Sequence, residues 1–249
     1  VAVRVHAVDH PSFEADIAAI AGKAGRCLSH IMIPKVESVA DVERAERALI
    51  SAGAKDLPIH VLIESPTAVH NAFAIARHPR VPSLSFGLMD FVSTHNGAIP
   101  AQAMQSAWQF SHPLVVRAKL EIASACHAHG KVPSHCVVTE FSDTNAMRAA
   151  AERASQEFGF TRMWSIHPSQ IRPILEALSP KVAEIELASE IVLAGYKALW
   201  APISHQGHLH DRASYRFYWQ VLERAHRTGR HLAKEVLEFF TDTTGDSHA

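Results

Sequence analysis

The sequence predicts an α/β protein built around a parallel sheet, and three observations support this fold class. Short apolar segments alternate strictly with helical segments up to about residue 175. The apolar segments are uninterrupted and rich in branched side chains, which is typical of strands buried on both faces. Two of them end on a carboxylate, Glu64 and Asp90. An acid at the carboxyl end of a barrel strand points into the mouth where ligands bind.

Six strand–helix units follow one another, whereas a (β/α)8 TIM barrel has eight. We therefore expect a TIM barrel whose first two strand units are missing from this chain. The chain also begins inside a strand without Met, so we expect the natural protein to be longer at its N-terminus. A doubly wound open sheet is the alternative. It would need no further units, but no Gly-rich phosphate-binding fingerprint follows any strand.

The elements are predicted in order from periodicity and from the residues that begin and end helices. The strands are expected at residues 1–6, 30–34, 59–64, 84–87, 132–138 and 162–166. The helices are expected at residues 11–24, 38–53, 68–77, 113–130, 144–158 and from 169 onward. Residues that favour a helix start are Pro11 or Ser12, Ser38, Pro113 and Asp143, and glycines that end a helix are Gly53, Gly130 and Gly159.

Pro180 marks a boundary between two domains. Residues 1–179 form the predicted barrel, and residues 180–249 form a C-terminal helical arm or lid. Helices are expected at 182–199 and from 213 to 227 or beyond, separated by a polar, histidine-rich stretch at 202–211. Residues 241–249 are expected to lack regular structure.

Composition excludes several classes of partner. Of the 249 residues 47% are hydrophobic and 20% charged, the net charge is −1, and the pI is about 7.1. These values are typical of a globular protein that binds neither nucleic acid nor a membrane surface. No transmembrane run or signal peptide is evident, and the three cysteines lack metal-binding spacing. Reduced thiols in the cytoplasm are therefore expected. The 18 scattered histidines are interpreted as surface or core residues.

Glu64 and Asp90 are the candidate metal ligands. Because the two predicted strands are separated by one helix, their terminal acids can share a hard divalent cation, and Mg²⁺ prefers oxygen ligands of this kind. Zinc would instead favour converging His or Cys side chains. The structural alternative is that both acids are strand-end caps or ion-pair partners. The metal site makes an enzyme the preferred class over a binding module.

Other polar residues are expected at the same end of the sheet. Arg4 alternates with Val3 and Val5, so it can face the barrel interior and clamp a substrate carboxylate or enolate oxygen; a rim salt bridge is the alternative. Lys35 and Glu37 follow the next strand as substrate-binding candidates or a structural pair. His167 ends the last strand, as a hydrogen-bond donor to substrate or as a loop anchor.

Five segments together resemble the citrate lyase β-subunit and malyl-CoA lyase family, within the HpcH/HpaI aldolase group. They are Val3-Arg-Val-His6, Ile33-Pro-Lys-Val-Glu-Ser38, Leu62-Ile-Glu-Ser65, Phe86-Gly-Leu-Met-Asp90 and Ser165-Ile-His-Pro-Ser-Gln-Ile171. They occur in the family's order and with family-like spacing over residues 1–175.

The resemblance implies a Mg²⁺-dependent (β/α)8 lyase that cleaves or forms a C–C bond next to a carbonyl. It implies that Glu64 and Asp90 hold Mg²⁺ and that Arg4 contacts the substrate, which in many members is a CoA thioester such as malyl- or citramalyl-CoA. Gly207-His-Leu-His-Asp211 matches a C-terminal motif whose Asp enters a neighbouring subunit's site as acid or base, so Asp211 is the second catalytic candidate. Family members are typically trimers or hexamers.

This chain departs from the family at four positions near the expected site. His6 replaces the usual Asn, Ser65 replaces Thr, Leu88-Met89 replaces smaller residues, and His135 stands where Asp is common. These departures concern the substrate more than the metal. Two alternatives therefore stay open: an aldolase acting on a free 2-keto or 2-hydroxy acid or other non-CoA substrate, and a non-catalytic subunit that keeps the fold.

Overall fold

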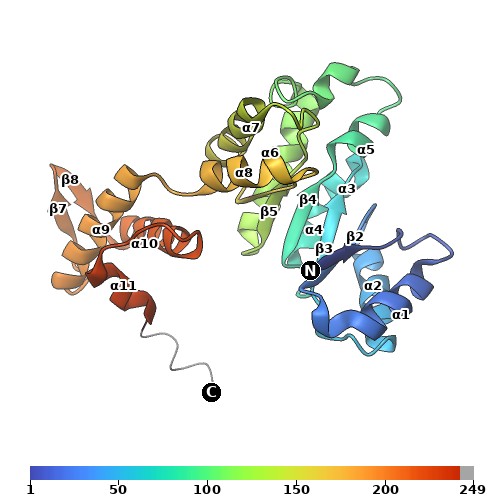
Figure 1. The fold of residues 1–249 in the computed structure, drawn as a ribbon, viewed down its shortest axis with the longest axis horizontal. Coiled ribbons are helices and arrows are strands. Elements are labelled where there is room, and N and C mark those ends of the chain that lie inside the picture. Colours follow the sequence, from blue (N-terminus) through green and yellow to red (C-terminus); the bar gives the residue numbers. More distant parts are fainter. Residues whose placement is uncertain (242–249) are drawn as a thin grey trace. The chain divides into compact units, whose positions relative to one another are not determined.

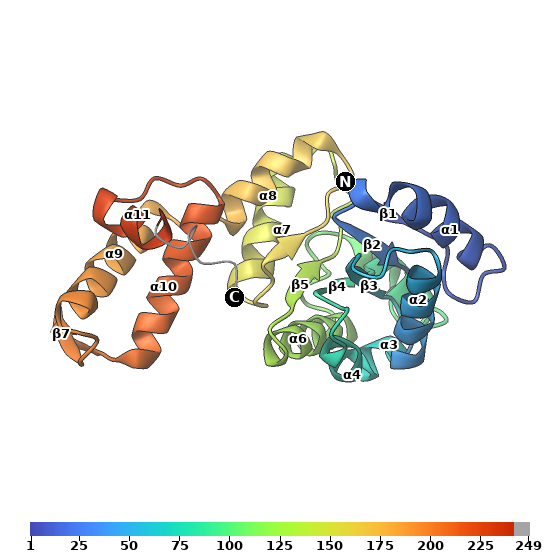
Figure 2. The ribbon, with the colours of Figure 1, turned by 90° about the horizontal axis from the view of Figure 1, so that it is seen from below.

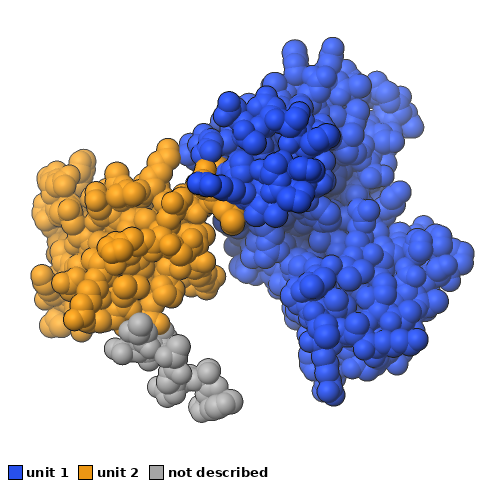
Figure 3. Space-filling view, viewed as in Figure 1, with its two compact units in different colours: residues 1–174 blue, residues 175–249 orange. Residues whose placement is uncertain are grey.

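The computed structural model describes residues 1–241 and divides into two compact units, Val1–Ile174 and Leu175–Ala249 (Figure 3). The division falls inside α8 (Ile171–Leu178), a few residues before the expected boundary at Pro180. Within the described residues, no helix is both long enough and apolar enough to span a bilayer.

The first unit is organised around a curled, parallel half-barrel sheet (Figure 1). Its six strands are β1 (Ala2–Arg4), β2 (His30–Ile33), β3 (Ile59–Ile63), β4 (Ser83–Phe86), β5 (Val132–His135) and β6 (Arg162–Met163). They pair in strict chain order, each parallel to the next. A doubly wound sheet reverses its strand order at a switch point, so the sequential order contradicts that alternative.

Helices cover the convex face of the sheet (Figure 2). They are α1 (Phe13–Ala24), α2 (Val39–Ser51), α3 (Pro66–His70), α4 (Ala72–Arg77), α6 (Pro113–Ala128) and α7 (Thr144–Gln156). The single helix expected over residues 68–77 is divided at Asn71. A short helix that was not expected, α5 (Leu88–Ser93), follows β4 directly.

The two faces of the sheet differ in polarity. Ile31, Ile33, Leu84 and Phe86 are almost completely buried, and with the period of two in a strand they alternate with residues of the concave face. That face surrounds a cavity of about 400 Å³, which is lined by His30, Met32, His60, Ser85, Ser134 and Arg162, among others. The apolar core thus lies between sheet and helices, and the hollow of the half-barrel is lined by both polar and apolar side chains.

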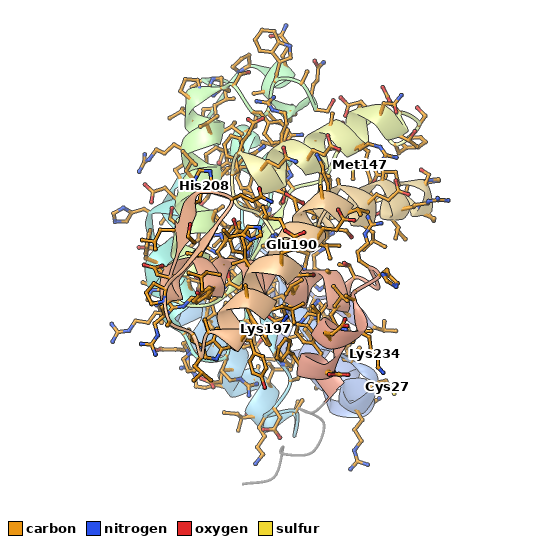
Figure 4. All side chains as sticks on the ribbon, turned by 90° about the vertical axis from the view of Figure 1, so that its left-hand side faces the viewer. Cys27, Met147, Glu190, Lys197, His208 and Lys234 are labelled. Carbon is orange, nitrogen blue, oxygen red and sulfur yellow. The ribbon has the colours of Figure 1, made fainter. Side chains whose placement is uncertain are left out.

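The second unit has its own helical core. Its elements are α9 (Val182–Lys197), β7 (Ile203–His205), β8 (His208–His210), α10 (Arg212–Arg227) and α11 (Lys234–Thr241). Val192, Leu222 and Val236 are among its buried residues. Glu190 lies on α9 (Figure 4), and its carboxylate oxygen is 3.1 Å from Nε2 of His205 in the hairpin.

The polar, histidine-rich stretch between the two helices forms a β-hairpin, β7–β8, and its turn residues Gln206 and Gly207 both have positive φ. Thr241, where irregular structure was expected to begin, is the last residue of α11. Residues 242–249 lie outside the described residues.

Candidate active site

Glu64 follows β3 directly and continues the face that carries His60 and Leu62, because alternate residues of a strand share a face. Its side chain is only 7% exposed, and Oε2 accepts a hydrogen bond from the backbone N–H of Lys35 at 2.9 Å. Burial, followed by the negative charge of Asp90, raises the pKa of this carboxyl, against the opposing effect of the Lys35 N–H. The carboxylate is therefore held in place but poorly solvated.

Asp90 lies in the first turn of α5, and not at the end of the strand as the sequence suggested. β4 ends at Phe86, and Gly87 turns the chain into the helix. A Cβ atom at residue 87 would lie 2.4 Å from Cγ and 2.6 Å from Oε1 of Glu64. The absence of a side chain at Gly87 thus makes room for Glu64 beside the turn that carries Asp90.

Lys35 connects the two acids. Its backbone has φ 53°, a left-handed conformation that is strained for a residue with a side chain. In this conformation the N–H donates to Glu64 while Nζ lies 3.5 Å from Oδ1 of Asp90. Both the Lys35 and Asp90 side chains are more than half exposed, so the ion pair is open to solvent and weak.

A cavity of about 610 Å³ joins these groups to the loop after β1. It is lined by Arg4, Val5, His6, Ala7, Asp9, His10, Pro11, Pro34, Lys35, Glu64 and Asp90. Arg4 pairs in register with Met32 and also borders the concave-face cavity. Within residues 1–241 it forms no ion pair, so the rim salt bridge considered for Arg4 is not formed by the described part of the chain.

Glu37 and His167 are placed elsewhere. Glu37 Oε2 accepts a 2.6 Å hydrogen bond from the Ser65 hydroxyl, and Asn71 donates to its carbonyl, so Glu37 supports the turn after Glu64 without lining the cavity. His167 accepts a hydrogen bond from the Ser169 N–H and caps a short 3-10 helix. This contact fits the alternative that His167 anchors a loop. His135 also lies away from the cavity, stacked on Phe110 in the helical layer.

Asp211 belongs to the second unit. It is the N-cap of α10, where its Oδ1 accepts hydrogen bonds from the backbone N–H groups of Ala213 and Ser214. Asp211 therefore stabilises the first turn of α10.

Sequence reasoning missed a histidine–aspartate pair at the pocket. His6 Nδ1 lies 2.6 Å from Oδ2 of Asp16, and the His6 backbone N–H donates to the same oxygen at 3.1 Å. The position of His6, two residues after Arg4 at a strand's carboxyl end, was a usable signal. The pairing of His6 with Asp16 could not be read from the sequence, because it depends on how α1 packs against the loop.

The donor set around Glu64 and Asp90 fits Mg²⁺. Both groups are carboxylates, both line one cavity, and the proximity of Asp90 contributes to the raised pKa of Glu64. A cation would relieve this repulsion. In residues 1–241 no group of three or more His, Cys, Asp or Glu side chains could hold a metal, so water or substrate would have to supply the other ligands, as is common for Mg²⁺.

A parallel sheet in chain order that curls into a half-barrel, with two acids and an arginine lining one cavity, defines an α/β half-barrel protein with a site suited to a cation. The comparisons identify the particular family. Residues 1–168 match the model of the HpcH/HpaI aldolase/citrate lyase family, and the chain belongs to this family.

Individual relatives agree with this assignment. The chain is 31% identical over 217 residues to an L-malyl-CoA/beta-methylmalyl-CoA lyase from Cereibacter sphaeroides, with 77% of this chain and 64% of that protein covered. The chain thus spans less than two thirds of the length of that relative. A citrate lyase from Burkholderia xenovorans LB400 superposes with a TM-score of 0.84 at 48% identity, covering 95% of this chain and 76% of the other.

A solved complex is relevant to the metal. The protein CitE from Mycobacterium tuberculosis, in complex with magnesium and pyruvate, has a TM-score of 0.59 at 25% identity, covering 73% of this chain and 69% of that one.

Proposed function

We propose that this protein is a Mg²⁺-dependent carbon–carbon lyase that cleaves a hydroxyacyl-CoA such as malyl-CoA or citramalyl-CoA. The observation that carries the proposal is the single cavity shared by Glu64, Asp90 and Arg4 at the carboxyl end of the sheet. The malyl-CoA lyase relative supports the substrate class, and the complex of CitE with magnesium and pyruvate supports the metal.

The residues have separate roles in this proposal. Glu64 and Asp90 would hold Mg²⁺, which supplies a Lewis acid for the carboxylate and hydroxyl oxygens of the substrate. Lys35 fixes Glu64 through its N–H and offers Nζ to an anionic substrate. Arg4 would pair with a substrate carboxylate or with developing enolate charge. Asp211 of a neighbouring subunit would exchange a proton with the acyl-CoA carbon, and His167 and Glu37 would act by supporting loops.

Three further features belong to the same proposal. The half-barrel would form part of an eight-stranded barrel, which its curl and sequential strand order support. The protein would assemble as a homotrimer or hexamer, because Asp211 is expected to act in a neighbouring subunit. A cytoplasmic location is supported by Cys27, Cys126 and Cys136, which are all free thiols.

The test is an assay of glyoxylate or pyruvate release from malyl-CoA and citramalyl-CoA, with Mg²⁺ and with EDTA. We expect Mg²⁺-dependent release, and a loss of about 100-fold or more in Glu64→Gln and Asp90→Asn if each ligand contributes about 3 kcal/mol. Release of free CoA without glyoxylate or pyruvate would show thioester hydrolysis instead. If the protein cleaves free hydroxy acids but none of the CoA esters, the result would favour the non-CoA aldolase.

A further inference from the structure

The loop after β1 carries a second chemical group at the pocket, formed by His6, His10 and Asp16. His6 and His10 line the same cavity as Glu64 and Asp90. Their rings are stacked, with centroids 4.0 Å apart and an interplanar angle of 9°. These three residues are distinct from the proposed metal ligands, Glu64 and Asp90, and from the catalytic candidates Arg4 and Asp211.

The hydrogen bonds fix which nitrogen of each ring carries a proton. Two bonds from His6, one from its backbone and one from its ring, lower the pKa of Asp16 and keep it ionised. An ionised carboxylate only accepts hydrogen bonds, so His6 Nδ1 must donate and Nε2 carries the free lone pair. The Ser12 N–H donates to Nδ1 of His10, which places the proton of His10 on Nε2.

We propose that His6 is the catalytic base for the substrate hydroxyl, and that Asp16 is the residue that positions it. This inference rests on the proposed lyase function and adds to it a proton acceptor from the same chain. An imidazole held by a carboxylate through Nδ1, with Nε2 free at a pocket, is the arrangement that general bases require.

The proposed step moves one proton to His6 and breaks one C–C bond of the substrate. Nε2 of His6 takes the proton of the hydroxyl group, and the carbon–oxygen bond becomes a carbonyl as the C–C bond next to it breaks. The electron pair of that bond remains on the acyl-CoA fragment as an enolate. The enolate takes a proton at carbon from Asp211 or solvent, and His6 returns its proton to solvent. The products are a 2-oxo acid and an acyl-CoA.

The charges around His6 fit this role. Asp16 of α1 contacts one ring edge and His10 stacks on the face. Arg4, Asp9, Lys35, Glu64 and Asp90 are the other charged residues around the cavity. The His6 side chain is 53% exposed, so a substrate can reach it.

Three variants of the full chain test the proposal: His6→Ala, Asp16→Asn, and His129→Ala as a matched control at the exposed C-cap of α6. For the ester cleaved by the wild type, we expect His6→Ala to lose about 100- to 10,000-fold in kcat with little change in KM. The limb of the pH–rate profile that reports this base should disappear. Asp16→Asn should lose about 100-fold or more, because an Asn amide can donate to Nδ1 and move the ring proton to Nε2.

His129→Ala should behave as the wild type, and all variants should retain Mg²⁺ affinity by calorimetry. A His6→Ala enzyme that keeps kcat within about threefold, or that changes only KM, would overturn the proposal.

A second measurement separates this inference from the proposed function. Long-range ¹⁵N–¹H spectra of the wild type should show His6 protonated at Nδ1, and Asp16→Asn should shift the proton to Nε2. Glyoxylate with Mg²⁺ should perturb the Nε2 resonance of His6. If no ester is cleaved, the lyase proposal fails while this result still decides whether His6 is a base facing the ligand. A proton on Nε2 in the wild type, or no response to glyoxylate, would contradict the inference.

Discussion

At the residue scale, Glu64 is held in a position that does not favour its own charge. Burial and Asp90 raise its pKa, so the protonated form is favoured in the folded protein more than in the unfolded chain. Because the pKa of Glu64 is raised in the folded protein, its protonated form contributes to the free energy of unfolding at low pH. This contribution is lost as the pH rises through the pKa of the folded protein. A cation that binds the ionised form restores that stability, so the site is suited to a metal at neutral pH.

Gly87 gives the first prediction. Gly87→Ala should place a methyl group against Cγ and Oε1 of Glu64 and displace the carboxylate. Because misplaced ligands and their supports typically weaken metal affinity by about 10- to 100-fold, we expect a loss of this size for Mg²⁺, measured by calorimetry. Gly25→Ala is the matched control, because its Cβ would meet only Cβ of Ala54, at 3.6 Å. Equal Mg²⁺ affinity in the two variants would contradict the steric argument.

Lys119 of α6 gives a pH prediction. It is fully buried, with Nζ 2.9 Å from Gln109 Oε1 and 3.7 Å from the centre of the Phe110 ring. Burial lowers its pKa from 10.5 to about 8. The unfolded chain therefore binds this proton more tightly, and the free energy of unfolding should rise between about pH 8 and pH 10, by up to roughly 3 kcal/mol.

Urea unfolding of wild type and Lys119→Met at several pH values measures this effect, since other titrating groups cancel in the difference. The wild type should gain stability relative to the variant as the pH rises. Parallel curves would show that Lys119 keeps an ordinary affinity for its proton.

Some residues of the site could be predicted from sequence and others could not. Strand alternation predicted the orientation of Arg4, and the end of an apolar segment predicted the position of Glu64; both signals are local in the sequence, and both residues line the cavity. The histidine–aspartate pair joins residues ten positions apart through the packing of α1, and Glu37 turns toward Ser65 instead of the cavity. Such contacts depend on tertiary structure that the pattern of apolar residues does not encode.

At the scale of elements, Asp211 has an observed role as the N-cap of α10 and a proposed role in proton transfer, and substitutions can separate the two. Asn caps helices about as well as Asp, whereas Ala costs about 1 kcal/mol. Asp211→Asn should therefore unfold like the wild type in urea, while Asp211→Ala should be less stable. If the carboxyl transfers a proton in a neighbouring subunit, Asp211→Asn should also lose about 100-fold or more in kcat.

Asp143→Asn is the matched control, because Asp143 caps α7 through its side chain in the same manner. An Asp211→Asn enzyme as active as Asp143→Asn would leave Asp211 with the capping role alone.

The elements that were predicted correctly have strong local signals. Strands β2 and β3 are mainly apolar, and the order of the six parallel strands follows from their alternation with helices. Helix α5 was missed because Leu88 and Met89 continue the apolar run of β4, and only the turn at Gly87 separates them. The hairpin β7–β8 was missed because its strands are short and rich in histidine, so that no alternating apolar pattern marks them.

At the scale of the whole molecule, each unit has a core of its own, so damage to one core should remain local. Leu222→Ala in the second unit should cost about 2–5 kcal/mol, because the side chain is fully buried. Hydrogen exchange should then increase in α9, α10 and α11, with protection of β2, β3 and β4 unchanged. Leu209→Ala, at a side chain 74% exposed, should change stability by less than about 0.5 kcal/mol. A uniform loss of protection would indicate one cooperative structure.

The space at Gly87 also limits how this site can evolve. Every one-base change in a glycine codon that alters the amino acid introduces a Cβ atom, and any Cβ here would collide with Glu64. Variation should therefore be purged at this turn for as long as the carboxylate is needed. In the loop after β1, Asp9 and His10 have no such steric restriction, because both are exposed. New substrate preferences should arise by mutation in that loop, while the acidic side of the pocket changes little.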